Sequence, residues 1–189
     1  MMMDKLFLHI CCAPCALYPI TQLQEEGISL TGFFYNPNIQ PLKEFKRRKE
    51  TLRQWAIKNK KIPIVWDDSY PLEEWLLRAI QLGTERCKIC YFDRMVRTAE
   101  EAKKRDFSHF STTLLTSTHQ KHDWVREAGE KAAFQVGIKF YYEDWRLGWE
   151  WAEKTSKKQE MYRQGYCGCV LSEKERYEKK KSKDEKESL

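Results

Sequence analysis

The chain has 189 residues and a formal net charge of +6, from 34 lysines and arginines against 28 aspartates and glutamates. This length is enough for one domain with a buried core. No stretch is apolar for long enough to span a membrane, and the N-terminal segment MMMDKLFLHICC has only a brief apolar run without a small-residue cleavage site. We therefore expect a cytoplasmic protein with no membrane partner. The basic excess fits a polyanionic partner such as RNA.

Predicted strands and helices alternate along the chain. The apolar run from Leu6 predicts a buried first strand that ends at Cys11-Cys12, and further strands are predicted at 29–35, 62–66, 109–117 and 139–142. Helices are predicted between and after them, at 16–26, 41–60, 71–82, 87–105, 121–136 and 148–163. This alternation predicts an α/β fold with a parallel, doubly wound sheet flanked by helices.

The last stretch, from residue 173, differs in composition from the rest of the chain. It holds seven basic and six acidic residues and lacks a sustained apolar period. Such a composition cannot bury enough apolar surface to offset the entropy of ordering. We expect a single catalytic domain over 1–172 and a disordered charged tail over 173–189.

All seven cysteines fall into three tight clusters, and none stands alone. The first cluster follows the first strand directly, at the sheet edge where ligand sites of open α/β sheets lie. Clustered cysteines in a cytosolic protein indicate metal or redox chemistry more often than structural disulfides. The clusters are Cys11, Cys12 and Cys15, then Cys87 and Cys90, then Cys167 and Cys169.

Spacing alone leaves the kind of centre open. The pairs Cys12/Cys15 and Cys87/Cys90 could supply the four thiolates of a zinc site or of a cubane iron–sulfur cluster, and spacing slightly favours zinc. Seven cysteines exceed the need of one closed zinc site, which favours a working centre. A disulfide across the single residue between Cys167 and Cys169 would close a tight, easily reduced ring. That pair is therefore predicted to be redox-active or to bind a second metal.

Six motifs occur together in a fixed order: CCAPC, YNPNI before a basic helix, ERCKICY, STTLLTS, DWRLG and YRQGYCGC. Over nearly the whole chain to residue 172, this combination resembles the cobalamin-independent epoxyqueuosine reductases, the QueH family. The resemblance implies a five-stranded sheet similar to the PP-loop, HUP-like Rossmann-type fold. It also implies the final step of queuosine biosynthesis, a two-electron removal of the epoxide oxygen from epoxyqueuosine at the wobble position of tRNA.

The resemblance further implies a [4Fe–4S] cluster with an additional mononuclear iron close by. Its cluster ligands would be Cys11, Cys12, Cys87 and Cys90, whereas Cys167 and Cys169 would form the redox-active or second-metal pair. Spacing by itself would choose Cys15 in place of Cys11. All seven cysteines therefore stand as candidate metal ligands.

The implied reaction also needs electrons and a proton. An unidentified low-potential donor would supply the electrons, and Asp144 is the candidate catalytic acid. Tyr35, Tyr91 and Tyr166 are further candidates for the proton donor. His9 lies inside the first strand and is predicted to be a hydrogen-bonded core residue.

The tRNA is expected to meet the basic side of the predicted helix 41–60 through its anticodon loop. The side chains proposed to contact phosphates are Lys46, Arg47, Lys49 and Arg53. An aromatic residue such as Tyr35 or Trp66 could stack on the splayed base. Arg94, Arg97 and Lys103 form the alternative surface.

Three other functions remain open from the sequence. One is a zinc-stapled tRNA-binding module without catalysis, and another is a dithiol oxidoreductase that uses Cys167 and Cys169 alone. The third is a PP-loop-like tRNA thiolase, although the chain has CCAPC where those enzymes have a Ser-Gly-Gly-x-Asp-Ser loop.

Overall fold

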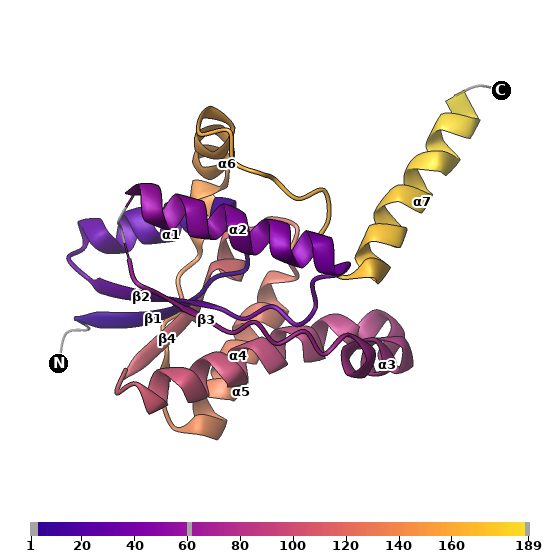
Figure 1. The fold of residues 1–189 in the computed structure, drawn as a ribbon. Helices are drawn as coiled ribbons and strands as arrows, with labels where there is room; N and C mark the ends of the chain where they lie inside the picture. Colours follow the sequence, from indigo (N-terminus) through magenta and orange to yellow (C-terminus); the bar gives the residue numbers. More distant parts are fainter. Residues whose placement is uncertain (1–3, 60–61, 188–189) are drawn as a thin grey trace.

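The computed structural model describes residues 4–59 and 62–187, and its centre is a five-stranded sheet with strand order β3-β2-β1-β4-β5 (Figure 1). All four strand pairings are parallel. The predicted parallel α/β sheet is thus confirmed. The strands are β1 (Lys5–His9), β2 (Ser29–Phe34), β3 (Ile64–Trp66), β4 (His109–Thr112) and β5 (Lys139–Phe140).

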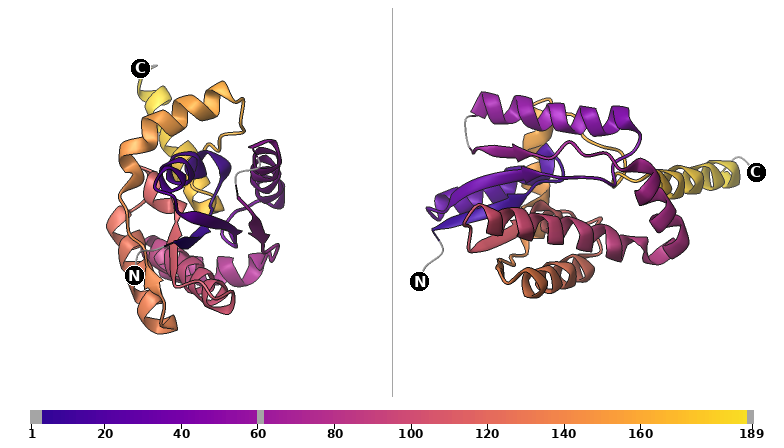
Figure 2. Two further views of the ribbon diagram at one scale, coloured as in Figure 1. Left: turned by 90° about the vertical axis from the view of Figure 1, so that its left-hand side faces the viewer. Right: turned by 60° about the horizontal axis from the view of Figure 1, so that its bottom comes forward.

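Helices cover both faces of this sheet (Figures 1 and 2). One face carries α1 (Ala13–Glu25) and α2 (Leu42–Asn59), with α6 (Trp149–Lys158) packed on α1. The other face carries α4 (Arg86–Lys104) and α5 (His122–Val136). At one end of the molecule lie α3 (Leu72–Leu82) and the projecting helix α7 (Val170–Glu187). No helix among the described residues is both long and apolar enough to cross a membrane.

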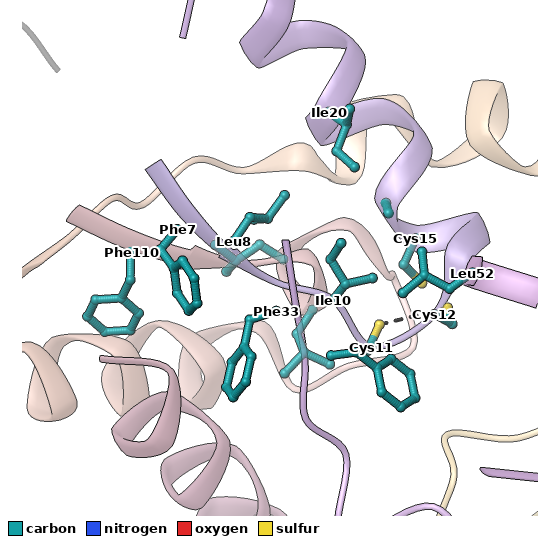
Figure 3. Packing of buried hydrophobic residues seen from close by; sticks show 14 of the residues in the cluster. Phe7, Leu8, Ile10, Cys11, Cys12, Cys15, Ile20, Phe33, Leu52 and Phe110 are labelled. Atoms are coloured by element: carbon teal, nitrogen blue, oxygen red, sulfur yellow. Dashed lines mark hydrogen bonds between the residues drawn. The ribbon is translucent and has the colours of Figure 1, made fainter. Parts of the chain in front are cut away.

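The central strand β1 is buried on both sides, as expected of a parallel strand between two helical layers. Its Phe7 packs against Phe33 of β2 with ring centroids 5.4 Å apart, and Phe110 of β4 lies in the same core (Figure 3). At the end of β1, His9 is in register with Phe33 on one side and Thr112 on the other. The segments that follow β1, β2 and β4 therefore leave the sheet at the same edge.

His9 is a satisfied core residue, as predicted. It is fully buried, and its Nε2 donates to the carbonyl oxygen of Tyr35 at 2.9 Å. Since Nε2 holds the proton, Nδ1 accepts the hydrogen bond from the Thr112 hydroxyl at 2.8 Å. The ring thus ties the ends of β1, β2 and β4 together.

Two element boundaries at this edge differ from the prediction. Helix α1 begins at Ala13 rather than at residue 16, because Pro14 occupies the first turn, where a missing N–H costs nothing. The strand predicted over 109–117 ends at Thr112, whose hydroxyl accepts from the Leu114 N–H. A short 3₁₀ turn, η2 (Thr113–Thr116), follows it. Cys15 therefore lies on a helix, and the threonines after β4 lie in a turn.

The C-terminal segment also differs from the prediction. The tail predicted to be disordered is instead helical as far as Glu187, and residues 188–189 lie outside the described part of the chain. The predicted end of α2 at residue 60 also lies outside the described residues. Lysine, glutamate and arginine are strong helix formers, which favours a helix over this stretch. An ion pair of 2.6 Å between Glu175 and Arg86 joins α7 to the start of α4.

Close packing between α1 and the start of α6 gives a stability prediction. A methyl group at Gly148 would overlap the ring of Tyr18, although the backbone there, with φ −87°, accepts any residue. We expect Gly148→Ala to lower the free energy of unfolding by roughly 1–3 kcal/mol, as overpacked cores do. Leu147→Ala, at a side chain that is 90% exposed, should change it by less than about 0.5 kcal/mol. Urea unfolding of both variants measures this, and equal stabilities would refute the packing argument.

Candidate functional site

The first cysteine cluster lies directly beyond the carboxyl end of β1 (Figure 3). Cys11 and Cys12 lie in the connection to α1, and Cys15 lies on the first turn of that helix. The three sulfur atoms are all within 4.8 Å of one another, with Cys11 Sγ 3.8 Å from Cys12 Sγ. Among the described residues, this trio is a group that could hold a metal ion.

The threonines after β4 hold this cysteine loop in place. The Thr113 hydroxyl accepts from the Cys11 N–H at 3.1 Å and donates to Cys11 Sγ at 3.4 Å. The Thr116 hydroxyl donates to the Cys15 carbonyl at 3.1 Å. The STTLLTS motif thus serves as the support of the CCAPC motif.

The second and third cysteine clusters lie next to each other. Cys87 and Cys90 are on the first turns of α4, and Cys169, from the loop before α7, packs with Cys90 in one buried cluster. Burial raises the pKa of the Cys90 thiol to about 12, with further contributions from the charges of Cys167 and Cys169. All seven cysteines are free thiols. Cys87 and Cys90 are not part of the compact group formed by the first cluster.

A cavity of about 300 Å³ connects the first and third clusters. Cys11 and Cys15 line it from one side, and Cys167 lines it from the loop before α7. The remaining wall combines amides, aromatic rings and charged side chains: Gln120, Gln164, His119, Trp149, Tyr166, Arg48, Glu153, Arg163 and Arg176, with Pro14, Leu114 and Ser117. This volume lies at the lower end of the range of roughly 300–1,000 Å³ that is typical of small-molecule sites.

Donor groups point at the sulfur atoms around this cavity. Gln164 Nε2 donates to Cys12 Sγ at 2.9 Å, and Gln120 Nε2 lies 3.5 Å from Cys167 Sγ. The main-chain N–H of Ser172 donates to Cys169 Sγ at 3.3 Å. Such hydrogen bonds stabilise negative charge on sulfur and tune metal–thiolate centres.

Cys12 is the most acidic thiol of its trio. Hydrogen bonds from Cys11 and Cys15 lower the pKa of Cys12 well below its usual value, and the charge of Arg48 adds to the effect. The hydrogen bond that the Cys11 thiol donates to Cys12 raises the pKa of Cys11 to about 11. Cys12 is therefore the thiol of this trio that releases its proton most readily, and metal binding to cysteines requires such release.

Three buried arginines surround the cysteines. Arg48, Arg86 and Arg94 are 2%, 7% and 2% exposed. Arg48 pairs with Glu44 at 2.6 Å and donates to the main-chain carbonyls of Tyr166 and Cys167, so it fixes the loop that carries the third cluster. Buried cations require nearby negative charge. The hydrogen-bond donors to sulfur and the three buried arginines are both compatible with an anionic group held by thiolates.

The structure does not bring Asp144 to the cavity. Its carboxylate caps the turn η3 (Trp145–Gly148), accepts from the Arg146 side chain at 2.8 Å and lies 3.9 Å from His122 Nε2. Hydrogen bonds from Arg146 lower the pKa of Asp144 to about 2. A carboxylate that is ionised at neutral pH cannot donate a proton, and the predicted catalytic acid therefore does not fit this position.

The tyrosines proposed as proton donors have fixed partners. The Tyr91 hydroxyl donates to Gln120 Oε1 at 2.8 Å, and the Tyr166 hydroxyl, at the cavity wall, donates to the Gln40 carbonyl.

Sequence reasoning missed Gln120 and Gln164. The only signal for Gln164 was its place inside the YRQGYCGC motif.

Of the residues proposed to bind RNA on α2, Lys46 and Arg47 are exposed, and the Arg47 guanidinium stacks 3.7 Å from the Tyr162 ring centroid. The two others have acidic partners on the surface, Lys49 with Asp68 and Arg53 with Glu50. The alternative surface is wrong for Arg94, because this side chain is buried and cannot meet phosphates.

Fold and site together define an α/β protein with a group of cysteines that could hold a metal ion at the carboxyl edge of a parallel sheet. Residues 6–175 match the sequence model of the family described as epoxyqueuosine reductase QueH. The chain is 35% identical over 181 residues to the epoxyqueuosine reductase QueH of Dehalococcoides mccartyi, covering 96% of this chain and 99% of that relative. This protein belongs to the epoxyqueuosine reductase QueH family, as the sequence motifs predicted.

Two further comparisons agree. The epoxyqueuosine reductase QueH of Thermotoga maritima is 36% identical over 187 residues, which cover 94% of each chain. A solved structure described as a predicted subunit of tRNA methyltransferase from Methanocaldococcus jannaschii superposes with a TM-score of 0.53 and 8% identity, over 82% of this chain and 75% of that one. At such low identity, the second match supports the fold alone.

The anchoring role of Arg48 can be tested by substitution. Arg48→Ala leaves the buried Glu44 carboxylate without its cation, so we expect the free energy of unfolding to fall by roughly 3–5 kcal/mol. Hydrogen exchange at residues 166–169 should also accelerate, because two carbonyls lose their donor. Lys46→Ala, on the exposed side of the same helix, is the matched control and should change neither. Unaltered exchange in Arg48→Ala would show that the loop is held by other contacts.

Proposed function

We propose that this protein is an epoxyqueuosine reductase, which removes the epoxide oxygen of epoxyqueuosine at the wobble position of tRNA as the final step of queuosine biosynthesis. The observation that carries the proposal is a cavity lined by cysteines of the first and third clusters, with the second cluster packed beside the third, in a chain of this family. The name of the curated relatives supplies the substrate, and the thiol site supplies the means for a reduction.

The proposed cofactor is a [4Fe–4S] cluster held by Cys11, Cys12, Cys87 and Cys90, with one additional iron near Cys167 and Cys169. When bound, iron of this kind supplies electrons one at a time and a Lewis acid for the departing oxygen. Free thiols, the donors aimed at sulfur and the buried arginines support an anionic thiolate-bound group. Cys15 shares the compact group with Cys11 and Cys12, and is the competing ligand.

The chain's own residues would hold the modified base and exclude water. Loss of the epoxide oxygen as water consumes two electrons and two protons, leaving a carbon–carbon double bond. Cys167 is exposed at the cavity wall, where its sulfur can meet a bound ligand. As a redox pair, Cys167 and Cys169 would release two electrons and two protons on forming a disulfide, which balances the reaction. An external low-potential donor would then restore the thiols.

The tRNA would reach the cavity through its anticodon loop. Anticodon bases are single-stranded, and turning one into a pocket costs less than it would in a duplex. The exposed Lys46 and Arg47 are available for phosphate contact, whereas Lys49 and Arg53 would first have to release their acidic partners. Trp149 and His119, at the cavity wall, offer rings for stacking on the base.

The decisive experiment is anaerobic incubation of iron-reconstituted protein with tRNA that carries epoxyqueuosine and a strong reductant. Mass spectrometry of the nucleosides should show loss of one oxygen. Cys167→Ser should abolish this conversion while leaving the absorption spectrum of the cluster largely intact, because the residue serves the step beside the cluster. A colourless protein with stoichiometric zinc and no conversion would instead favour the tRNA-binding module.

Iron content tests the ligand assignment. Replacement of Cys12 or Cys90 by serine should remove the cluster, since a serine hydroxyl stays protonated near neutral pH and is a poor substitute for thiolate. Cys11→Ser should do the same and Cys15→Ser should retain iron. Retention in Cys11→Ser with loss in Cys15→Ser would reverse the assignment within the first cluster.

The RNA surface is tested by charge reversal on α2. Lys46→Glu combined with Arg47→Glu should weaken tRNA binding and reduce the slope of log affinity against log salt by roughly one or more. The matched control reverses Lys104 and Lys139, which lie at the opposite, amino-terminal edge of the sheet. Equal tRNA affinities in the two double variants would place the binding surface elsewhere. Iron content should be unchanged in both.

A further inference from the structure

Arg94 is a buried cation without a carboxylate partner. It lies one helical turn after Cys90 on α4 and is 2% exposed. Its Nε donates to the Cys90 carbonyl at 2.9 Å, and its Nη2 donates to Cys90 Sγ at 3.2 Å. Its neighbours on the helix have other partners, since Asp93 binds Arg78 and Arg97 binds Asp67. None of the ion pairs among the described residues includes Arg94.

The groups whose charges act on Arg94 come from three separate segments. Cys90 and Tyr91 lie on its own helix, Cys167 lies on the loop before α7, and Cys11 lies in the connection after β1. Each of these can be negative only as a thiolate or phenolate, and the Tyr91 hydroxyl keeps its proton in the hydrogen bond that it donates to Gln120 Oε1 at 2.8 Å. The sulfur atoms of three cysteine clusters are therefore the counter-charge available to Arg94.

The two other buried arginines differ from Arg94 in this respect. Arg48 has Glu44 as a partner and Arg86 has Glu175. Removing a guanidinium from water without a compensating anion costs free energy. Burial of Arg94 beside these cysteines is therefore favourable only when the cysteines carry negative charge. A four-thiolate metal centre carries such a charge.

We propose that Arg94 is a positioning residue that balances the negative charge of the thiolate-held centre and makes that centre easier to reduce. Reduction adds one electron to the centre, and a fixed cation beside it stabilises the more negative state. Because Arg94 donates to Cys90 Sγ and interacts electrostatically with Cys11 and Cys167, it acts on the cluster and the neighbouring cysteine pair together. This inference rests on the proposed iron–sulfur centre.

The test is a redox titration of iron-reconstituted protein with dithionite as the one-electron donor, followed by electron paramagnetic resonance. In Arg94→Gln we expect the equilibrium constant for reduction to fall about tenfold or more, which is about 59 mV for one electron. Arg94→Lys keeps the charge and should stay near the wild-type potential. Arg97→Gln, on the exposed side of the same helix, is the matched control and should not shift it. A wild-type potential in Arg94→Gln would overturn the proposal.

Iron retention decides the remaining cases. If Arg94→Gln loses iron and Arg94→Lys keeps it, the charge is needed and the proposal stands. If both lose it, thermal unfolding of the metal-free proteins decides. If the metal-free variants are as stable as the metal-free wild type or more stable, Arg94 serves only the centre and the proposal is supported. If they are less stable, Arg94 is a structural support and the proposal is overturned. A wild-type protein that binds no iron would refute the proposed function itself, before any variant is compared.

Discussion

Parallel pairing of β1 with β2 and β4 is the constraint on which the rest of the structure depends. It sends three chain segments out of the sheet at one edge, where His9 binds both neighbours. CCAPC follows β1, and the threonine turn that supports it follows β4. Without this common edge, the threonines would have no loop to hold, and the first cysteine trio would have no fixed geometry.

Electrostatics gives this edge its chemical character. Seven thiols and three buried arginines lie in this part of the molecule. The positive charge of the arginines stabilises thiolates that would be unfavourable in an apolar interior. The individual thiols differ sharply in acidity, with the pKa of Cys12 lowered and those of Cys11 and Cys90 raised. If a metal displaced the protons of these thiols, the resulting negative charge would be stabilised by the three buried arginines.

Helix α2 links the proposed RNA surface with the reactive loop. Its exposed side carries Lys46 and Arg47, while Arg48, the next residue, points inward and holds the carbonyls of Tyr166 and Cys167. Tyr162 connects the two sides, since its hydroxyl donates to Glu44 and its ring stacks on Arg47. The proposed RNA surface and the loop that carries Cys167 therefore share contacts through this one helix.

The sequence by itself determined the alternation of strands and helices and the family, because apolar periodicity and short motifs are local properties. It could not show that α1 starts at Ala13, that Arg48 and Arg94 are buried, or that Asp144 binds Arg146 away from the cavity. Those facts depend on which segments meet across the sheet edge. Charge looks the same in a sequence whether the side chain is buried or solvated, and only tertiary packing separates the two.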